Sequence, residues 1–182
     1  FRTLYSSKES FDEIIPLDKN YRFKLTKPIS NFNWKDIYFD QTNNLINLEY
    51  KDQNKIIFKS KKLTKYKSSS YILFEKNNLL INDEKGNIII FSINDNKIIS
   101  KFNFYKKKYK KIKKVLNFLI EDNIVYVSDN LGYLYAYNYQ TKNILWAKNY
   151  KVPFRSNLKV TKDKLVAANQ NNNLFFFNKL NG

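Results

Sequence analysis

The stretch SDNLGYLYAYNYQTKNILW, residues 128–146, combines a turn signal, an alternating aromatic run and one of the two tryptophans of the chain. Asp129 to Gly132 favour a tight turn, because glycine accepts a positive φ and an aspartate side chain can accept hydrogen bonds from its own backbone. Tyrosine then occupies every second position from 133 to 137, so alternate side chains point to opposite faces of an extended strand. Both faces are apolar or aromatic, which predicts a strand that is covered on both sides.

The residues around this strand complete a unit of four short strands. Residues 124–127 (IVYV) are a second β-rich run, which makes 124–138 a hairpin. Residues 143–149, after the turn at 140–142, are predicted to form a third strand that carries Trp146. A further run at 117–121 precedes the hairpin and is the fourth candidate strand.

The same unit occurs three times along the chain. Alignment of Gly86 with Gly132 superimposes residues 77–100 on the unit that ends at Trp146, without a gap inside the hairpin. A third copy covers residues 163–182 and has Asn172 at the glycine position. These positions are 46 residues apart (86 to 132) and 40 residues apart (132 to 172). Repeats of this length, built from short strands, are typical of β-propeller blades.

We therefore predict an all-β protein, a β-propeller fragment built of four-stranded antiparallel blades. Residues 55–182 are expected to hold the blades, with repeat units over 68–105, 114–150 and 156–182. Residues 1–54 are expected to form an extended lead-in and an incomplete first blade, whose outer strand would lie near 54–62. Because the chain has no methionine and too few blades for a ring, we expect a fragment that is truncated before ring closure. An irregular antiparallel sandwich is the alternative fold.

Composition limits the classes of function. The net charge is +17, but 30 of the 33 basic residues are lysine, whereas a surface that grips phosphate commonly uses more of the bidentate arginine. Lysine, asparagine, isoleucine, phenylalanine and tyrosine all have A/T-rich codons, so we attribute much of the basicity to genome composition and expect no nucleic acid as partner. The absence of cysteine and histidine removes thiolate chemistry and the usual histidine base or metal ligand.

The unit around Gly132 resembles the PQQ-like β-propeller repeat, in which a hairpin leads to Gly-x-Leu-Tyr-Ala-Leu-Asp, a Thr-Gly turn and a Leu-Trp pair. Here residues 132–138 are GYLYAYN, 140–142 are QTK, and Leu145 precedes Trp146. The following YKVPFRSNLKV, residues 150–160, is similar to the linker of that family. The copy at Gly86 departs from the pattern, since Ser100 stands where the tryptophan is expected. The resemblance implies that Gly86, Gly132 and Trp146 are structural positions, with Trp146 docked between blades.

Two branches of this repeat family have different functions. One is a non-catalytic scaffold, typified by the BamB-type lipoprotein of the outer-membrane β-barrel assembly machinery. The other comprises quinoprotein dehydrogenases, which bind pyrroloquinoline quinone (PQQ) over a calcium ion. The sequence favours the scaffold, because it lacks cysteine and histidine and because its turn carboxylates do not form a recognisable metal loop; these are Asp83, Glu84, Asp122 and Asp129.

The scaffold branch implies no catalytic site, no metal and no cofactor. It also implies a protein partner, the β-barrel assembly machinery, and a periplasmic location at the outer membrane, with peripheral attachment through an unseen lipid anchor. A fragment of a PQQ-dependent dehydrogenase, with PQQ and calcium, is the alternative. A nucleic-acid-binding module is a further one.

Two connections between blades hold the candidate binding residues. Residues 152–157 offer Pro153, Phe154 and Arg155 as partner-binding candidates, because aromatic and arginine side chains are enriched at binding hot spots. Residues 105–115 (YKKKYKKIKKV) form a basic loop with tyrosines between lysines, a pattern that suits a nucleic-acid groove or an anionic lipid surface. A solvated loop is the alternative interpretation for its lysines, which are Lys106, Lys107, Lys108, Lys110 and Lys111.

Overall fold

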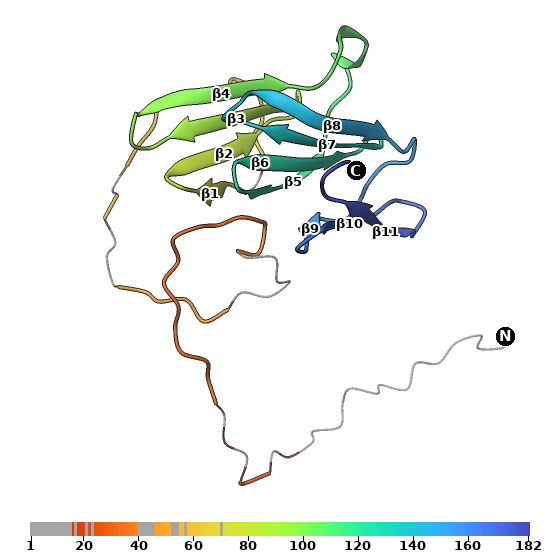
Figure 1. Cartoon of the computed structure of the whole chain (residues 1–182). Helices are drawn as coiled ribbons and strands as arrows, with labels where there is room; N and C mark the ends of the chain where they lie inside the picture. Colours follow the sequence, from red (N-terminus) through yellow and green to blue (C-terminus); the bar gives the residue numbers. More distant parts are fainter. Residues whose placement is uncertain are drawn as a thin grey trace, which may run out of the picture.

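The computed structural model describes residues 16, 18–20, 22, 24–39, 46–51, 55–56, 58–69 and 71–182. Three antiparallel sheets follow one another along this part of the chain (Figure 1). We call them blades 1, 2 and 3. Blade 1 contains β1 (Leu73–Glu75), β2 (Asn78–Asn82), β3 (Asn87–Ser92) and β4 (Lys97–Asn103) in that spatial order.

Blade 2 repeats this arrangement with β5 (Leu116–Glu121), β6 (Ile124–Asp129), β7 (Tyr133–Asn138) and β8 (Asn143–Asn149). Blade 3 has three strands, β9 (Lys159–Val160), β10 (Lys164–Ala168) and β11 (Leu174–Asn178), in the order β11-β10-β9. The predicted all-β class with four-stranded antiparallel sheets is thus confirmed. A single 3₁₀ turn (Lys107–Tyr109) interrupts the connection between β4 and β5, and the described residues contain no helix of the length and apolarity that crossing a membrane requires.

The strand register confirms the predicted hairpin. In β6 and β7, Val125 lies opposite Tyr137 and Val127 opposite Tyr135. The pairing of the third strand with the outer strand has a register shift at the same place in blades 1 and 2, between Ile90 and Phe91 of β3 and between Ala136 and Tyr137 of β7. The repeat therefore extends from the sequence pattern to irregularities of the sheet.

A side chain at the start of each hairpin turn holds that turn in place. Asp129 Oδ1 accepts hydrogen bonds from the backbone N–H groups two and four residues later, both at 2.8 Å. Asp83 Oδ1 accepts the same two bonds at 3.0 and 3.1 Å, and Asn169 Oδ1 at 3.0 and 3.2 Å. The residue three positions after this side chain has a positive φ in all three turns: 82° at Gly86, 84° at Gly132 and 61° at Asn172. These turns need glycine or asparagine at that position, because other residues are strained there.

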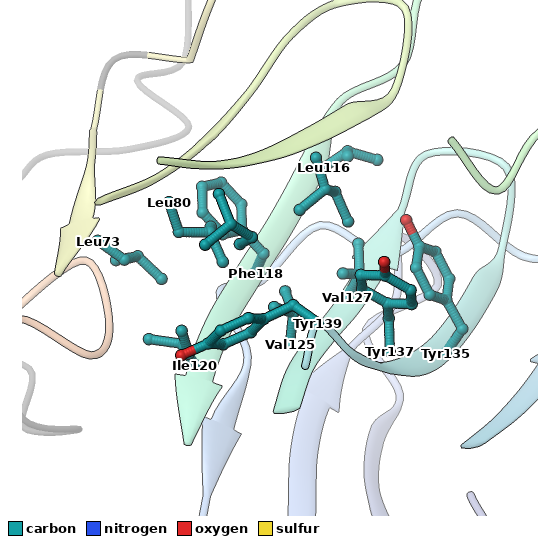
Figure 2. Close-up of a cluster of buried hydrophobic side chains, with 12 residues drawn as sticks. Leu73, Leu80, Leu116, Phe118, Ile120, Val125, Val127, Tyr135, Tyr137 and Tyr139 are labelled. Carbon is teal, nitrogen blue, oxygen red and sulfur yellow. The ribbon is translucent and has the colours of Figure 1, made fainter. Parts of the chain in front are cut away.

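The hydrophobic core lies between the blades rather than within one of them. The cluster between blades 1 and 2 joins leucines of β1, β2 and β5 to the tyrosines of β7 (Figure 2). Phe102 of β4 stacks on Tyr137 with ring centroids 4.0 Å apart. A second cluster, between blades 2 and 3, includes Leu134, Trp146 and Phe177. Blade 2 contributes to both clusters, so β7 is covered on both faces as its sequence predicts.

A short segment before the blades, residues 34–36, runs across the first strands of the three blades. Trp34 pairs with β1 through two backbone hydrogen bonds of 2.6 and 2.8 Å, and Figure 1 shows this part of the chain beside β1. The carbonyl of Lys35 accepts a hydrogen bond from Ile120 of β5 at 2.9 Å. Asp36, which is buried, forms a 2.6 Å ion pair with Lys159 of β9. One segment thus contacts the first strand of every blade.

The outer strand expected near 54–62 is absent from the described residues of that range, 55–56 and 58–62. Ile56 is 86% exposed, and Phe58 instead packs on Phe91 of blade 1 with ring centroids 5.5 Å apart. A strand needs a paired neighbour, and this segment lies against a face of blade 1 rather than along a strand edge. Much of the expected lead-in, including residues 1–15 and 40–45, lies outside the described residues.

Candidate functional site

The two connections between blades are built in the same way. The carbonyl of Val115 accepts a hydrogen bond from the hairpin turn of blade 2 at 3.2 Å, and that of Pro153 accepts one from the turn of blade 3 at 2.9 Å. The preceding residues, Lys114 and Val152, each lie against the turn glycine of the blade before. Lys114 and Val152 therefore occupy equivalent positions at the two junctions.

The three predicted partner-binding residues have different environments. Phe154 is 2% exposed and lies in the cluster between blades 2 and 3, so its side chain is not available to a partner. Arg155 is exposed, and its guanidinium donates one long hydrogen bond of 3.4 Å to Gln170. Pro153 is half-buried. A role of Arg155 in partner binding stays a prediction, whereas Phe154 fills the blade junction because an aromatic ring gains most from burial there.

The structure divides the predicted basic loop between two sides. Lys106, Lys107 and Lys110 line a groove of about 700 Å³ beside blade 1. Lys108 faces elsewhere, with its Nζ 4.8 Å from the ring centroid of Tyr109, and Lys111 is exposed outside the groove. The loop is therefore not one uniform charged surface.

We call this hollow the lysine groove. Its other walls come from β4, from the hairpin turn of blade 1 and from the segment before that blade. Every charged side chain in its lining is a lysine, and there are seven of them: Lys65, Lys85, Lys101, Lys106, Lys107, Lys110 and Lys114. Sequence reasoning missed four of these, Lys65, Lys85, Lys101 and Lys114, because they lie on separate segments with no shared motif.

Lys114 is the buried member of the groove, at 3% exposure. Its Nζ donates a hydrogen bond to the carbonyl of Tyr109 and lies 5.2 Å from the ring centroid of Tyr105. Burial lowers the pKa of Lys114, and the positive charge of Lys85 lowers it further, while the negative charges of Asp129 and Asp83 oppose these effects. Burial and the neighbouring lysine thus disfavour its charged form, while the hydrogen bond to Tyr109 and the ring of Tyr105 favour it.

Tyr105 joins the groove to the turn of blade 2. Its hydroxyl donates a 2.5 Å hydrogen bond to Asp129 Oδ2, and burial raises the pKa of Tyr105. Burial also raises the pKa of Asp129, against the hydrogen bonds from Tyr105 and from the turn backbone. Both oxygens of this carboxylate are therefore engaged within the fold.

The other turn carboxylates are also occupied or isolated. Asp83 holds its own turn and accepts a 2.7 Å hydrogen bond from Thr64. Asp122 is exposed and lies 3.9 Å from the ammonium of Lys76. Across the part of the chain that the structure describes, no three side chains of the types His, Cys, Asp and Glu are grouped so that they could hold a metal.

The structural repeat positions lie at contacts between blades. Trp146 is 9% exposed, and its Nε1 donates a 3.1 Å hydrogen bond to the carbonyl of Lys179 in blade 3. Ser100, at the equivalent place in blade 1, is also buried and forms a 2.8 Å hydrogen bond with the hydroxyl of Tyr137 in blade 2. A side-chain hydrogen bond thus crosses each of the two junctions, even where serine stands in place of the tryptophan.

Comparison with known proteins identifies the fold. No protein-family model and no curated protein sequence matches this chain. The computationally designed Ika4 protein is similar at a TM-score of 0.51 and 16% identity, over 60% of this chain and 64% of that one. The computationally designed Ika8 protein is similar at a TM-score of 0.52 and 16% identity, over 61% of this chain and 33% of that one.

BamB from Moraxella catarrhalis is similar at a TM-score of 0.44 and 16% identity, over 56% of this chain and 29% of that one. The matched region spans less than two thirds of each of these three structures. At such low identity the similarity is one of fold alone. The chain has a β-propeller fold, as its repeats predict.

Proposed function

We propose that this chain is a non-catalytic β-propeller scaffold that binds a protein partner at the junction of blades 2 and 3. The observation that carries the proposal is the use made of the turn carboxylates. Asp83 and Asp129, which the sequence offers as candidates for chemistry, accept the backbone hydrogen bonds that hold the hairpins. A carboxylate engaged in this way is a structural element rather than a general base.

Arg155 is the residue through which we propose the contact. Its backbone N–H donates a 3.1 Å hydrogen bond to the carbonyl of Ala168, and the neighbouring Ser156 hydroxyl accepts one from Ala168 at 2.7 Å. The backbone is thus fixed while the guanidinium, exposed and held by one long bond, keeps donors for a partner. Such pre-organisation lowers the entropic cost of binding.

We propose further that this partner is the outer-membrane β-barrel assembly machinery, and that the protein is periplasmic and associates peripherally with the membrane. Its support is the resemblance of the GYLYAYN run and Trp146 to the PQQ-like propeller repeat, together with the absence of cysteine and histidine, which favours the scaffold branch of that family.

The test measures binding of purified β-barrel assembly machinery to the wild-type protein, to Arg155→Ala and to Arg22→Ala. Arg22 is a matched control, because it is an exposed arginine outside the blades. We expect Arg155→Ala to weaken binding by about 2 kcal/mol, or roughly thirtyfold, the size typical of a truncated hot-spot charge. The control should bind as the wild type does.

Two results would contradict the proposal. Equal affinities for all three proteins, with a lower melting temperature for Arg155→Ala, would make Arg155 a brace of the blade junction. Calorimetric binding of PQQ together with calcium to the wild-type protein would favour the dehydrogenase branch instead.

A further inference from the structure

We propose that the lysine groove binds a short polyphosphate chain, a linear ligand that carries several phosphate groups close together. The proposed site lies on the opposite side of blade 2 from the junction that holds Arg155. It involves different residues and stands independently of the scaffold function.

The first support is the convergence of charge. Four segments between residues 65 and 114 bring seven lysines around one hollow: residues 65–66, the turn at 85–87, β4 and the loop 105–114. None of the seven pairs with a carboxylate of the described residues. Like charges around a shared hollow repel one another and concentrate a positive potential inside it. An anion in the groove would relieve that repulsion.

The second support is the contrast between the two blade junctions. Val152 is the equivalent of Lys114 at the other junction, where the backbone of an apolar residue lies against the turn glycine and no buried ammonium is present. Lys114 is nevertheless buried at its own junction as a cation, beside Lys85 and on the wall of the groove. Its Nζ donates to the carbonyl of Tyr109 and lies beside the Tyr105 ring but forms no ion pair with a carboxylate of the described residues, so its charge is only partly compensated. We therefore attribute the lysine to a ligand rather than to the fold.

The lining favours a ligand that carries several negative charges. Lysine ammonium groups bind phosphate oxygens as compact point charges, and a chain of phosphates presents such charges to several of the seven lysines at once. Lys65 and Lys85 lie within 5.5 and 5.8 Å of the centroid of the Tyr66 ring, and Tyr105 packs inward on Gly86. Tyr105 is thus covered and the Tyr66 ring has two ammonium groups near it, so the lining offers no row of aromatic faces on which successive nucleic-acid bases could stack.

The shape of the groove favours a compact ligand. A hollow of about 700 Å³ falls within the usual size of small-ligand sites, roughly 300–1,000 Å³. The two asparagines of the lining are engaged within the fold, since Asn103 Nδ2 donates to the carbonyl of Lys85 at 3.1 Å and Asn87 Nδ2 donates to Asp83.

The test titrates the full chain with sodium tripolyphosphate by calorimetry at low and moderate salt. Two triple variants differ only in where three charges are lost. One changes Lys106, Lys107 and Lys110 to glutamine. The control variant also introduces glutamine, at three exposed lysines that lie outside the groove: Lys108, Lys111 and Lys162. We expect one saturable site, at least about a tenfold loss of affinity in the groove variant and less than about a threefold loss in the control.

Lys114→Val separates binding from folding, because it copies the residue of the other junction. We expect it to weaken tripolyphosphate binding by about tenfold or more while the melting temperature without ligand stays equal or rises. A lower melting temperature with unchanged affinity would make Lys114 structural and overturn its place in the site.

The remaining outcomes decide the ligand class. Equal losses in the two triple variants would show that a diffuse surface charge binds the anion, and would refute a site. Binding of single-stranded RNA or of anionic vesicles with the same lysine dependence, but no binding of tripolyphosphate, would replace the proposed ligand with a nucleic acid or a membrane. Stronger binding of tripolyphosphate than of orthophosphate would support a chain of phosphates.

Discussion

Substitution of Gly132 tests the geometry by which blade 2 meets the following connection. Gly132 has a φ of 84°, and a Cβ placed on it would lie 2.9 Å from the backbone nitrogen and 3.0 Å from the carbonyl oxygen of Val152. Both of these contacts are with main-chain atoms, which cannot rotate away. Two separate penalties therefore apply to any other residue at this position.

The size of each penalty follows from the structure. A positive φ costs a residue such as alanine about 1–2 kcal/mol, and forcing a methyl group into a filled space costs about 1–3 kcal/mol. Gly132→Ala should therefore lower the free energy of unfolding by roughly 2–5 kcal/mol. Gly132→Asn separates the two penalties, because asparagine tolerates a positive φ and retains only the contact with Val152, for a cost of about 1–3 kcal/mol.

The assay is equilibrium urea unfolding followed by tryptophan fluorescence. Asn172→Gly is the matched control, since Asn172 occupies the same turn position in blade 3 with a φ of 61° and is exposed. It should change the free energy of unfolding by no more than about 0.5 kcal/mol. If Gly132→Asn is as stable as the wild type, the close approach of Val152 is not a constraint and the reasoning fails.

Ser100→Ala should cost about 1–2 kcal/mol, because it removes the hydrogen-bond partner of the buried Tyr137 hydroxyl. A double-mutant cycle with Tyr137→Phe should show a coupling of at least about 0.5 kcal/mol, and strict additivity would contradict the bond. Burial raises the pKa of Tyr71 and of Tyr126 from 10 to about 12. Because the folded-state pKa lies above the unfolded value, the stabilisation is complete below pH 10 and is lost as the pH rises to 12. Urea unfolding across that range should show a falling stability, with a smaller fall in Tyr71→Phe; a constant stability would show that these hydroxyls ionise freely in the fold.

The sequence by itself determined the strands, the hairpins and their threefold repetition. Residues 124–138 alternate and turn in a way that only a hairpin satisfies, and the pairing of Val125 with Tyr137 follows from the length of that turn. Such features depend on backbone preferences and on side-chain alternation over a few residues. The strands and hairpins are therefore visible in any single copy of the unit, and the repetition is visible when the copies are aligned.

Residues of the candidate sites were predictable only in part. The pattern around Arg155 and the lysines of the 105–115 loop stands out in the sequence, but the burial of Phe154 does not. An aromatic residue beside an arginine has the same signature whether it faces a partner or a neighbouring blade. The expected strand near 54–62 failed for a related reason, since β-rich composition does not supply a strand to pair with.

The tertiary structure alone decided where the blades meet other parts of the chain. Asp36 reaches Lys159 across 123 positions, and Lys65 joins Lys114 in one groove. No local pattern records such pairs, because each residue is ordinary in its own segment. The stacking of the blades brings them together, and the burial and charge they then share arise from distances between segments rather than from the order of residues along the chain.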